Sequence, residues 1–221
     1  MNTAVFLKIH VDTYARFAHI RTQLFQGSHE RQANALGNVL SEISCEVVEQ
    51  VFVVLLQENQ QHSQTGESEK VIQQILDAIR KYMPWSISFF ANDRLIPLVE
   101  YLSKNIQIED DVVYLTYPVT QQLTQQIQAS SQRLTEGQRQ EIPHALTLLT
   151  NVIDAGVTHL IREPKQCLKF NFVVDKTLNG VINMTTHLGY KRLEKLGTQI
   201  DQQVAAKYVD YFLKFMRHQN S

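Results

Sequence analysis

The chain has 221 residues, which is enough for one large domain or two small ones. Apolar residues make up 43% and charged residues 19%, values typical of a globular protein that buries a core. The net charge of −1 argues against a protein whose overall charge drives binding to nucleic acid or to an anionic membrane. Residues 1–161 carry 11 Lys and Arg against 17 Asp and Glu, and residues 162–221 carry 10 against 5. This imbalance indicates mutual attraction, an acidic partner for the basic end, or simply a solvated surface.

The two cysteines, Cys45 and Cys167, both fall within predicted helices. Two are too few for a disulfide framework, so we expect a reducing compartment. The N-terminal apolar patch has no basic stretch before it and is interrupted by charges, which argues against a signal peptide. The apolar run at 47–56 is shorter than the about 20 residues that span a bilayer. We therefore expect a soluble, cytoplasmic protein without a membrane span.

The first two predicted helices organise the N-terminal part of the chain. One begins near Phe6 and keeps helical spacing up to Gly27, which predicts a stop with left-handed backbone. The next, at about 30–57, begins with a single apolar stripe, and its end at 51–56 is apolar on every side. A helix that is apolar all round must be covered all round, so this is the expected central helix of a bundle. Gly37 within it predicts a close contact with a neighbour.

The remaining elements are mostly helical. A helix closed by Pro84 follows the polar stretch at 59–68, and another covers about 94–104. The segment 112–117 has the composition of a strand but no visible partner, so its type stays open. Later helical patterns cover 119–134, 135–163, 167–188, 190–196 and 199–217. These patterns predict an all-α fold, a single domain over 1–221 in which seven to eight helices form one bundle, with weak candidate boundaries at 59–68 and 104–110.

The familiar phosphate-binding, nucleophile and zinc motifs are absent, so no catalytic residue, metal or cofactor is expected. The helix at 167–188 does carry a polar residue at every fourth position from Asn171 to His187. Such a row spans about 24 Å and cannot converge on one atom. At most Asn183 and His187 share a ligand site, with His187 as the natural acid or base. A solvated or helix-facing polar seam is the more ordinary alternative.

One Glu-x-x-His pair, Glu141 and His144, raises the question of a metal site. Di-metal helical bundles use two such pairs, together with carboxylates from two other helices. The central helix offers Glu42, Glu46 and Glu49 on one face, but the chain has no second pair and a proline interrupts the first. We therefore expect no metal here and regard the acidic face as solvated.

A basic cluster, Lys191, Arg192 and Lys195, precedes a helix rich in glutamine. Its spacing faintly resembles a DNA-reading helix-turn-helix over 191–207. A leucine occupies the position where that motif needs a small residue, and the near-neutral chain lacks a basic footprint, so nucleic acid is an unlikely partner. The cluster is otherwise a solvated helix end or a surface for a protein partner.

Aromatic side chains gather in two places. Trp85 and Phe89 belong to a stretch at 85–90 without clean periodicity, which is our candidate lining of an apolar pocket, although core packing is more usual. The second set follows helical spacing and predicts either core packing or a dimer interface: Tyr208, Tyr211 and Phe215.

Three functions are left open. The leading hypothesis is an intracellular regulatory protein, not an enzyme, that binds a protein partner or forms a homodimer through 199–217. The alternative is a small-ligand carrier or enzyme whose internal pocket uses His187 with Asn183, or His144 with Glu141. Histidines facing a cavity would support it, and histidines facing solvent would not. DNA binding through 191–207 is the third, and it requires the basic cluster to be exposed.

Overall fold

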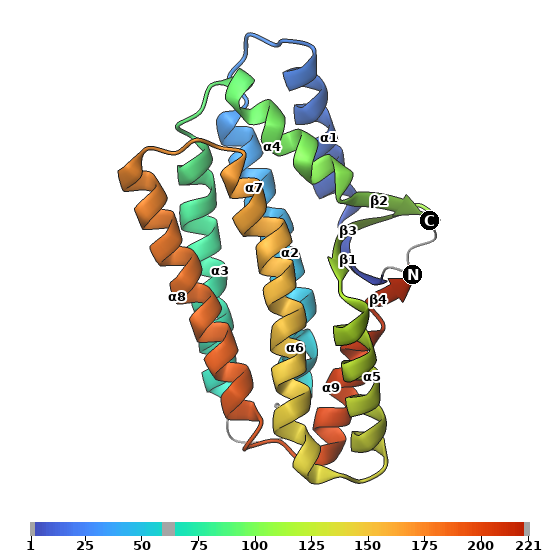
Figure 1. Ribbon diagram of the computed structural model, residues 1–221. Coiled ribbons are helices and arrows are strands. Elements are labelled where there is room, and N and C mark those ends of the chain that lie inside the picture. The colour runs from blue at the N-terminus through green and yellow to red at the C-terminus, as the bar shows by residue number, and fades with distance from the viewer. Residues whose placement is uncertain (1–2, 59–64, 219–221) are drawn as a thin grey trace.

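The protein folds as a long helical bundle with a small sheet on one side. The computed structural model describes residues 3–58 and 65–218, except for the side chains of 53–58 and 65. Helices account for 74% of the described residues, so the predicted mostly helical class is confirmed. Figure 1 shows four long helices running along the molecule: α2 (Ala33–Glu58), α3 (Thr65–Ile87), α6 (Ile142–Val157) and α8 (Phe172–Leu196). None of the helices in the described ranges combines the length and hydropathy that crossing a bilayer needs.

Shorter elements cover the two ends of the bundle. At one end lie α1 (Val11–Phe25) and α4 (Asn92–Lys104), and at the other lie α5 (Gln121–Thr135) and α9 (Gln202–Leu213) (Figure 1). The core forms two main clusters accordingly, one that includes Phe17 and Leu95 and one that includes Leu149 and Tyr208.

The central helix lies where the sequence predicts it, because α2 spans Ala33–Glu58 against the expected 30–57. At the start of its apolar end, Val51 and Phe52 are buried. The remaining side chains of the expected apolar end, at 53–56, lie outside the described residues. A side chain at Gly37 would come within 2.7 Å of the Cα atom of Pro84, so the predicted close contact is confirmed as the approach of α2 to α3.

The acidic face of α2 is partly solvated, as expected at Glu49, and its other carboxylates are turned toward α1, not toward the basic C-terminal part. Glu46 accepts hydrogen bonds from the backbone N–H of His10 at 2.9 Å and from the hydroxyl of Thr13 at 2.6 Å. It therefore places a carboxylate at the N-terminus of α1, where the unpaired N–H groups and the helix dipole favour a negative charge. Glu42 of α2 forms an ion pair with Arg16 of α1.

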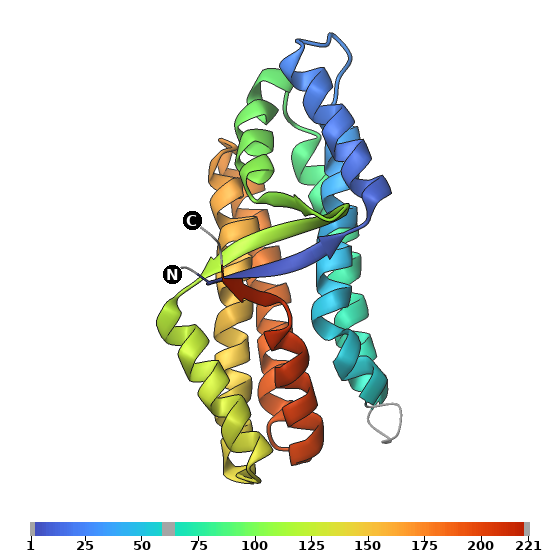
Figure 2. The same cartoon turned by 90° about the vertical axis from the view of Figure 1, so that its right-hand side faces the viewer.

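A four-stranded antiparallel sheet lies across the side of the bundle, in the order β2-β3-β1-β4 (Figure 2). The prediction that Phe6 and Leu7 begin a helix is wrong, because they belong to β1 (Thr3–Ile9) and α1 starts only at Val11. Leu7 faces the main core while Phe6 lies on the other face of the sheet, which is the two-residue period of a strand.

The open question about 112–117 is answered by the same sheet. The segment forms most of β3 (Val112–Val119), which pairs with β1 more than a hundred residues earlier and with its neighbour β2 (Ile106–Glu109). The candidate boundary at 104–110 therefore lies at the start of a hairpin, and most of the one at 59–68 lies outside the described residues. The fourth strand, β4 (Met216–His218), pairs with β1 and includes the end of the predicted C-terminal helix.

Two predicted helix ends are wrong. Pro84 does not close the third helix, because α3 continues to Ile87 and the backbone N–H of Ser88 still donates to the Pro84 carbonyl. The predicted helix end at 188, before Gly189, is also wrong, because α8 runs through Gly189 without interruption to Leu196. An isolated glycine costs a helix only about 1 kcal/mol relative to alanine, and packing of α8 against its neighbours exceeds that cost. The stop at Gly27, whose φ is 71°, is confirmed.

Candidate functional site

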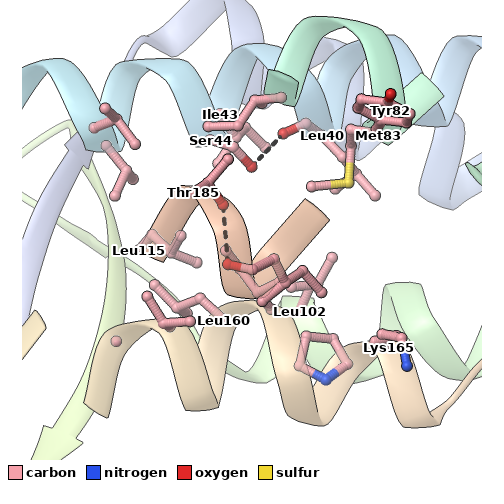
Figure 3. A pocket seen from close by; sticks show the side chains of 18 of the residues that line it. Leu40, Ile43, Ser44, Tyr82, Met83, Leu102, Leu115, Leu160, Lys165 and Thr185 are labelled. Atoms are coloured by element: carbon pink, nitrogen blue, oxygen red, sulfur yellow. Dashed lines mark hydrogen bonds between the residues drawn. The ribbon is translucent and has the colours of Figure 1, made fainter. Parts of the chain in front are cut away.

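An apolar cavity of about 230 Å³ lies in the half of the bundle nearer α1 and α4. Its walls come from α1, α2, α3, α4, α6 and α8, from the sheet, and from the segment that joins α6 to α8. Figure 3 shows Leu40 and Ile43 of α2 on one side and Leu160 on the other, with Leu115 of β3 between them at one end. The cavity is neither fully sealed nor a shallow surface groove.

Three hydroxyl groups on the wall are already satisfied by the backbone of their own helices. Ser44 donates to the Leu40 carbonyl at 2.8 Å, Ser86 to the Met83 carbonyl at 2.8 Å and Thr185 to the Val181 carbonyl at 2.9 Å. The first and third of these bonds are drawn in Figure 3. Hydroxyls bound in this way present mainly their carbon atoms to the cavity. The site is therefore suited to apolar contact.

A π-helical turn forms part of the wall. The turn η3 (Thr158–Arg162) lies between α6 and the short helix α7 (Glu163–Gln166), and its Leu160 and Ile161 face the cavity. Single π turns inside helices are frequent at functional sites. Tyr101 of α4 holds this turn from outside the cavity, because its hydroxyl lies 2.9 Å from the His159 carbonyl and 2.5 Å from Glu163 Oε2.

The same contacts shift two pKa values. Burial, and then the neighbouring carboxylate, raise the pKa of Tyr101 to about 12. The hydrogen bond from Tyr101 lowers the pKa of Glu163, and His159, with Nδ1 at 2.9 Å from Glu163 Oε2, lowers it further. The π turn is therefore held by a neutral phenol and an ionised carboxylate at neutral pH.

Two polar bridges connect α8 to the opposite wall. Tyr190 donates to Asp154 of α6 at 2.7 Å, and Asp154 also accepts from Arg162 at 2.8 Å. Lys165 of α7 donates to Asp175 of α8 at 2.5 Å. Burial alone would raise the pKa of Asp154, but the hydrogen bonds from Tyr190 and Arg162 outweigh it and hold that pKa below its usual value.

Between these bridges the wall is apolar and partly accessible. Val181 and Ile182 of α8 and Ile161 of η3 are half-buried, and all three line the cavity. We take this gap between α8 and the α6–η3–α7 segment as the mouth of the cavity.

The size of the cavity sets the size of a ligand. An apolar cavity of about 150 Å³ accepts benzene, with its six carbon atoms. On the same scale, about 230 Å³ accommodates about nine non-hydrogen atoms. A filled site also avoids the penalty for unfilled apolar space, about 24 cal/mol per Å³, or about 5 kcal/mol for a sealed cavity of this volume and less for a partly open one.

The four residues predicted to bind a ligand all lie outside this cavity. Asn183 and His187 are exposed on the far side of α8. Trp85 and Phe89 are 37% and 51% exposed and contact each other edge to face. The predicted stretch at 85–90 does reach the cavity, but through Ser86 and Ile87, which lie between Trp85 and Phe89 in the sequence and line the cavity.

The alternative pair, Glu141 and His144, lies near the opposite end of the bundle from the cavity. The closest approach of the two side chains is 3.9 Å, and His144 is about half exposed. Glu141 instead accepts from Arg133 and from Ser130, both at 2.7 Å, and the bond from Arg133 is the main reason that its pKa is lowered. With both predicted histidines directed to solvent, the structure gives no support to a pocket built around either of them.

The basic cluster does not form one exposed surface. Lys191 and Lys195 are exposed, but Arg192 is only 6% exposed. Its Nε donates to Ser68 at 2.8 Å and its Nη1 lies 3.1 Å from Glu67 Oε2, while Lys195 lies 2.7 Å from the same carboxylate. The cluster therefore ties α8 to the beginning of α3, and the exposure that DNA reading requires is not met.

The predicted C-terminal interaction residues pack into the protein itself. Tyr208 is fully buried, and its hydroxyl lies 3.3 Å from the carbonyl of Val51. Tyr211 and Phe215 are half-buried, and the Tyr211 hydroxyl donates to the carbonyl of Gln50 at 3.1 Å. Core packing, one of the two options that the sequence left open, thus accounts for this set.

Two residues that line the cavity, Tyr117 and Gly156, are not predicted by the sequence analysis to belong to a site. In the sequence, Tyr117 is one of eight tyrosines, and Gly156 is a glycine inside an apolar helical pattern. In the structure they meet: a side chain at Gly156 would come within 2.9 Å of the Tyr117 ring. A glycine within a helical pattern is the signal of a close approach that could have indicated this position.

Comparison of the chain with protein-family models, with curated proteins and with solved structures finds no match. The site is therefore interpreted from its own geometry.

Proposed function

We propose that the protein binds a small, neutral, largely apolar molecule in the cavity beside α8. The observation that carries this proposal is the cavity of about 230 Å³, whose wall combines apolar side chains with hydroxyls already bound to backbone carbonyls. Protein interiors are normally packed without large voids, because unfilled apolar space is destabilising. Ligand sites are typically concave and mostly apolar, and the space between the helices of a bundle is a common place for them.

Binding is favoured over catalysis by the chemistry of the wall. Among the described residues that line the cavity, the hydroxyls of Ser44, Ser86 and Thr185 donate to backbone carbonyls, not to a base that would activate them as nucleophiles. The one lysine of the wall, Lys165, is engaged by Asp175. A carrier or ligand-sensing protein is thus the form of the small-ligand hypothesis that we retain. We keep the cytoplasm as its expected location, since Cys45 and Cys167 are both free thiols.

Ligand-dependent thermal unfolding tests the proposal directly. Toluene and α-methylstyrene are suitable probes, because both are neutral, apolar and small enough for the cavity. A ligand at about a hundred times its Kd stabilises the folded state by about 2.7 kcal/mol, which raises the Tm of a protein of this size by about 5–10 °C. Heteronuclear NMR should place the affected signals at residues such as Leu115, Leu160 and Val181. No change in Tm and no shifted signals with either probe would overturn the proposal.

Self-association is a second candidate, on a surface different from the predicted one. Phe172 and Val173, at the start of α8, are 79% and 71% exposed, the highest values among the large apolar side chains described. Adjacent exposed apolar residues of this kind often mark an interface. Native mass spectrometry of the protein and of the double variant Phe172→Ser, Val173→Ser tests it. A monomer in both samples would remove this candidate.

A further inference from the structure

The hydroxyl of Tyr117 lies beside Gly156, which also lines the cavity, and it has no protein partner in the described ranges. Tyr117 extends from β3, lines the cavity and is only 2% exposed. Unlike the serine and threonine hydroxyls of the wall, its phenol oxygen makes no hydrogen bond with any residue in the described ranges. The oxygen is not one of the fully enclosed unpaired atoms of the described residues, so it keeps a small accessible surface that a molecule in the cavity can reach.

The neighbours of the ring show how this position is maintained. Gly156 of α6 lies against the phenol, and a Cβ atom there would be 2.9 Å from the ring carbon Cζ and 3.2 Å from the hydroxyl oxygen. The absence of a side chain at position 156 thus allows the hydroxyl to occupy its place. Burial, with a contribution from nearby Tyr190, raises the pKa of Tyr117, so the group is a neutral hydrogen-bond donor throughout the physiological range.

Neither a trapped water nor an ionic ligand suits this hydroxyl well. A buried water needs two to four polar partners, and the wall offers few that are not already engaged. An anionic ligand would lose its hydration without gaining a free cation, since Lys165 is held by Asp175 and Arg162 by Asp154. The partner that remains is a neutral acceptor oxygen carried into the cavity by an otherwise apolar molecule.

We propose that the ligand of this cavity is an apolar molecule with one neutral acceptor oxygen, such as a ketone, ester or ether, and that the Tyr117 hydroxyl donates a hydrogen bond to it. The inference rests on the proposed function, because it assigns the polar group of the ligand that the cavity binds. Tyr117 is then the residue that discriminates an oxygenated ligand from a hydrocarbon of the same shape.

Two probes of matched shape test this assignment. Acetophenone and α-methylstyrene differ only in that a carbonyl oxygen replaces a methylene group. Affinities of both are measured by calorimetry or NMR for the wild type and for Tyr117→Phe, which removes the hydroxyl and keeps the ring. We expect the substitution to weaken acetophenone binding about tenfold and to leave α-methylstyrene binding unchanged or stronger.

Infrared spectroscopy gives a readout that a purely structural change would not reproduce. The carbonyl stretch of bound acetophenone should lie at lower frequency in the wild type than in Tyr117→Phe, because the hydrogen bond weakens the C=O bond. The melting temperature of the variant serves as the check that it is folded. If both probes bind the wild type and Tyr117→Phe changes neither the affinity ratio nor the carbonyl frequency, the assignment of Tyr117 is wrong while the proposed function stands. If neither probe binds the wild type, the proposed function itself fails.

Discussion

Replacing Ala78 with leucine should stabilise the protein and weaken its binding of apolar molecules at the same time. Ala78 lies on α3, is 8% exposed and lines the cavity. Leucine adds three carbon atoms, and burying each contributes about 0.8 kcal/mol, for about 2.4 kcal/mol in total. Ordering the longer side chain costs about 0.5–1 kcal/mol. The free energy of unfolding should therefore rise by about 1.5–2 kcal/mol.

The assay is thermal or denaturant unfolding combined with a ligand titration. For a chain of this length the expected gain raises Tm by about 3–8 °C. The added carbons take about a third of the space for about nine atoms estimated above, so the affinity for α-methylstyrene should fall. Stability gained at the expense of binding is the expected behaviour when a functional cavity is filled.

Ala145→Leu is the matched control, because the chemistry is identical and the surroundings differ. Ala145 on α6 is fully buried but does not line the cavity. Inserting the same three carbons into close-packed surroundings should cost about 1–3 kcal/mol. If Ala78→Leu were to lower Tm as Ala145→Leu does, there would be no usable space at position 78, and the reasoning from the cavity would be refuted.

Three further outcomes are expected. Asp110 and Asp111 both have left-handed backbone, with φ of 49° and 62°, in the hairpin turn between β2 and β3. Replacing them with the Asn-Gly pair that such a turn prefers should stabilise the protein by about 1 kcal/mol in chemical denaturation. A loss of stability would contradict the assigned turn. Arg192→Gln should lower the free energy of unfolding by about 2 kcal/mol, because it removes the charged hydrogen bond to buried Ser68. Lys191→Gln, on the exposed side of the helix, should change the free energy of unfolding by less than about 0.5 kcal/mol. Equal effects of the two substitutions would mean that the buried contacts of Arg192 contribute nothing. Acid should also destabilise the fold, because four carboxyl groups have folded-state pKa values below their unfolded values. The stability that they contribute is present above about pH 4.5 and is lost as the pH falls further. A Tm that stayed constant between about pH 5 and 3 would argue against these contacts. These groups are Glu67, Glu141, Asp154 and Glu163.

Much of the helical architecture could be predicted because its signals are local. The period of apolar residues placed α2 within a few residues of its observed bounds, and Gly27 ended α1 through its own backbone preference. The same local signals failed at Pro84 and Gly189. Each of these residues disfavours a helix interior by itself, but contacts with neighbouring helices compensate for the cost.

The sheet and the uses of the polar residues depended on distant partners. The composition of 112–117 is typical of a strand. Its partner, Thr3–Ile9, is more than a hundred residues away, and no pattern in the sequence indicates that the two segments pair. Arg192 was correctly seen as part of a basic cluster, but its burial against Ser68 depends on how α8 lies beside α3. Charge is a property of the residue, whereas exposure is a property of the fold.

The sequence by itself determined which residues are apolar, where most of the helices lie and which chemical motifs are missing. Only the tertiary structure decided that the apolar faces of α2, α3 and α8 surround a space near Tyr117. The physical reason is that helix periodicity specifies the face a residue lies on, while the distance between two such faces depends on every contact that positions the helices. Ala78, which lines the cavity, and Ala145, which lies in the core, are therefore alike in the sequence. They differ only in whether neighbouring side chains fill the space beside them.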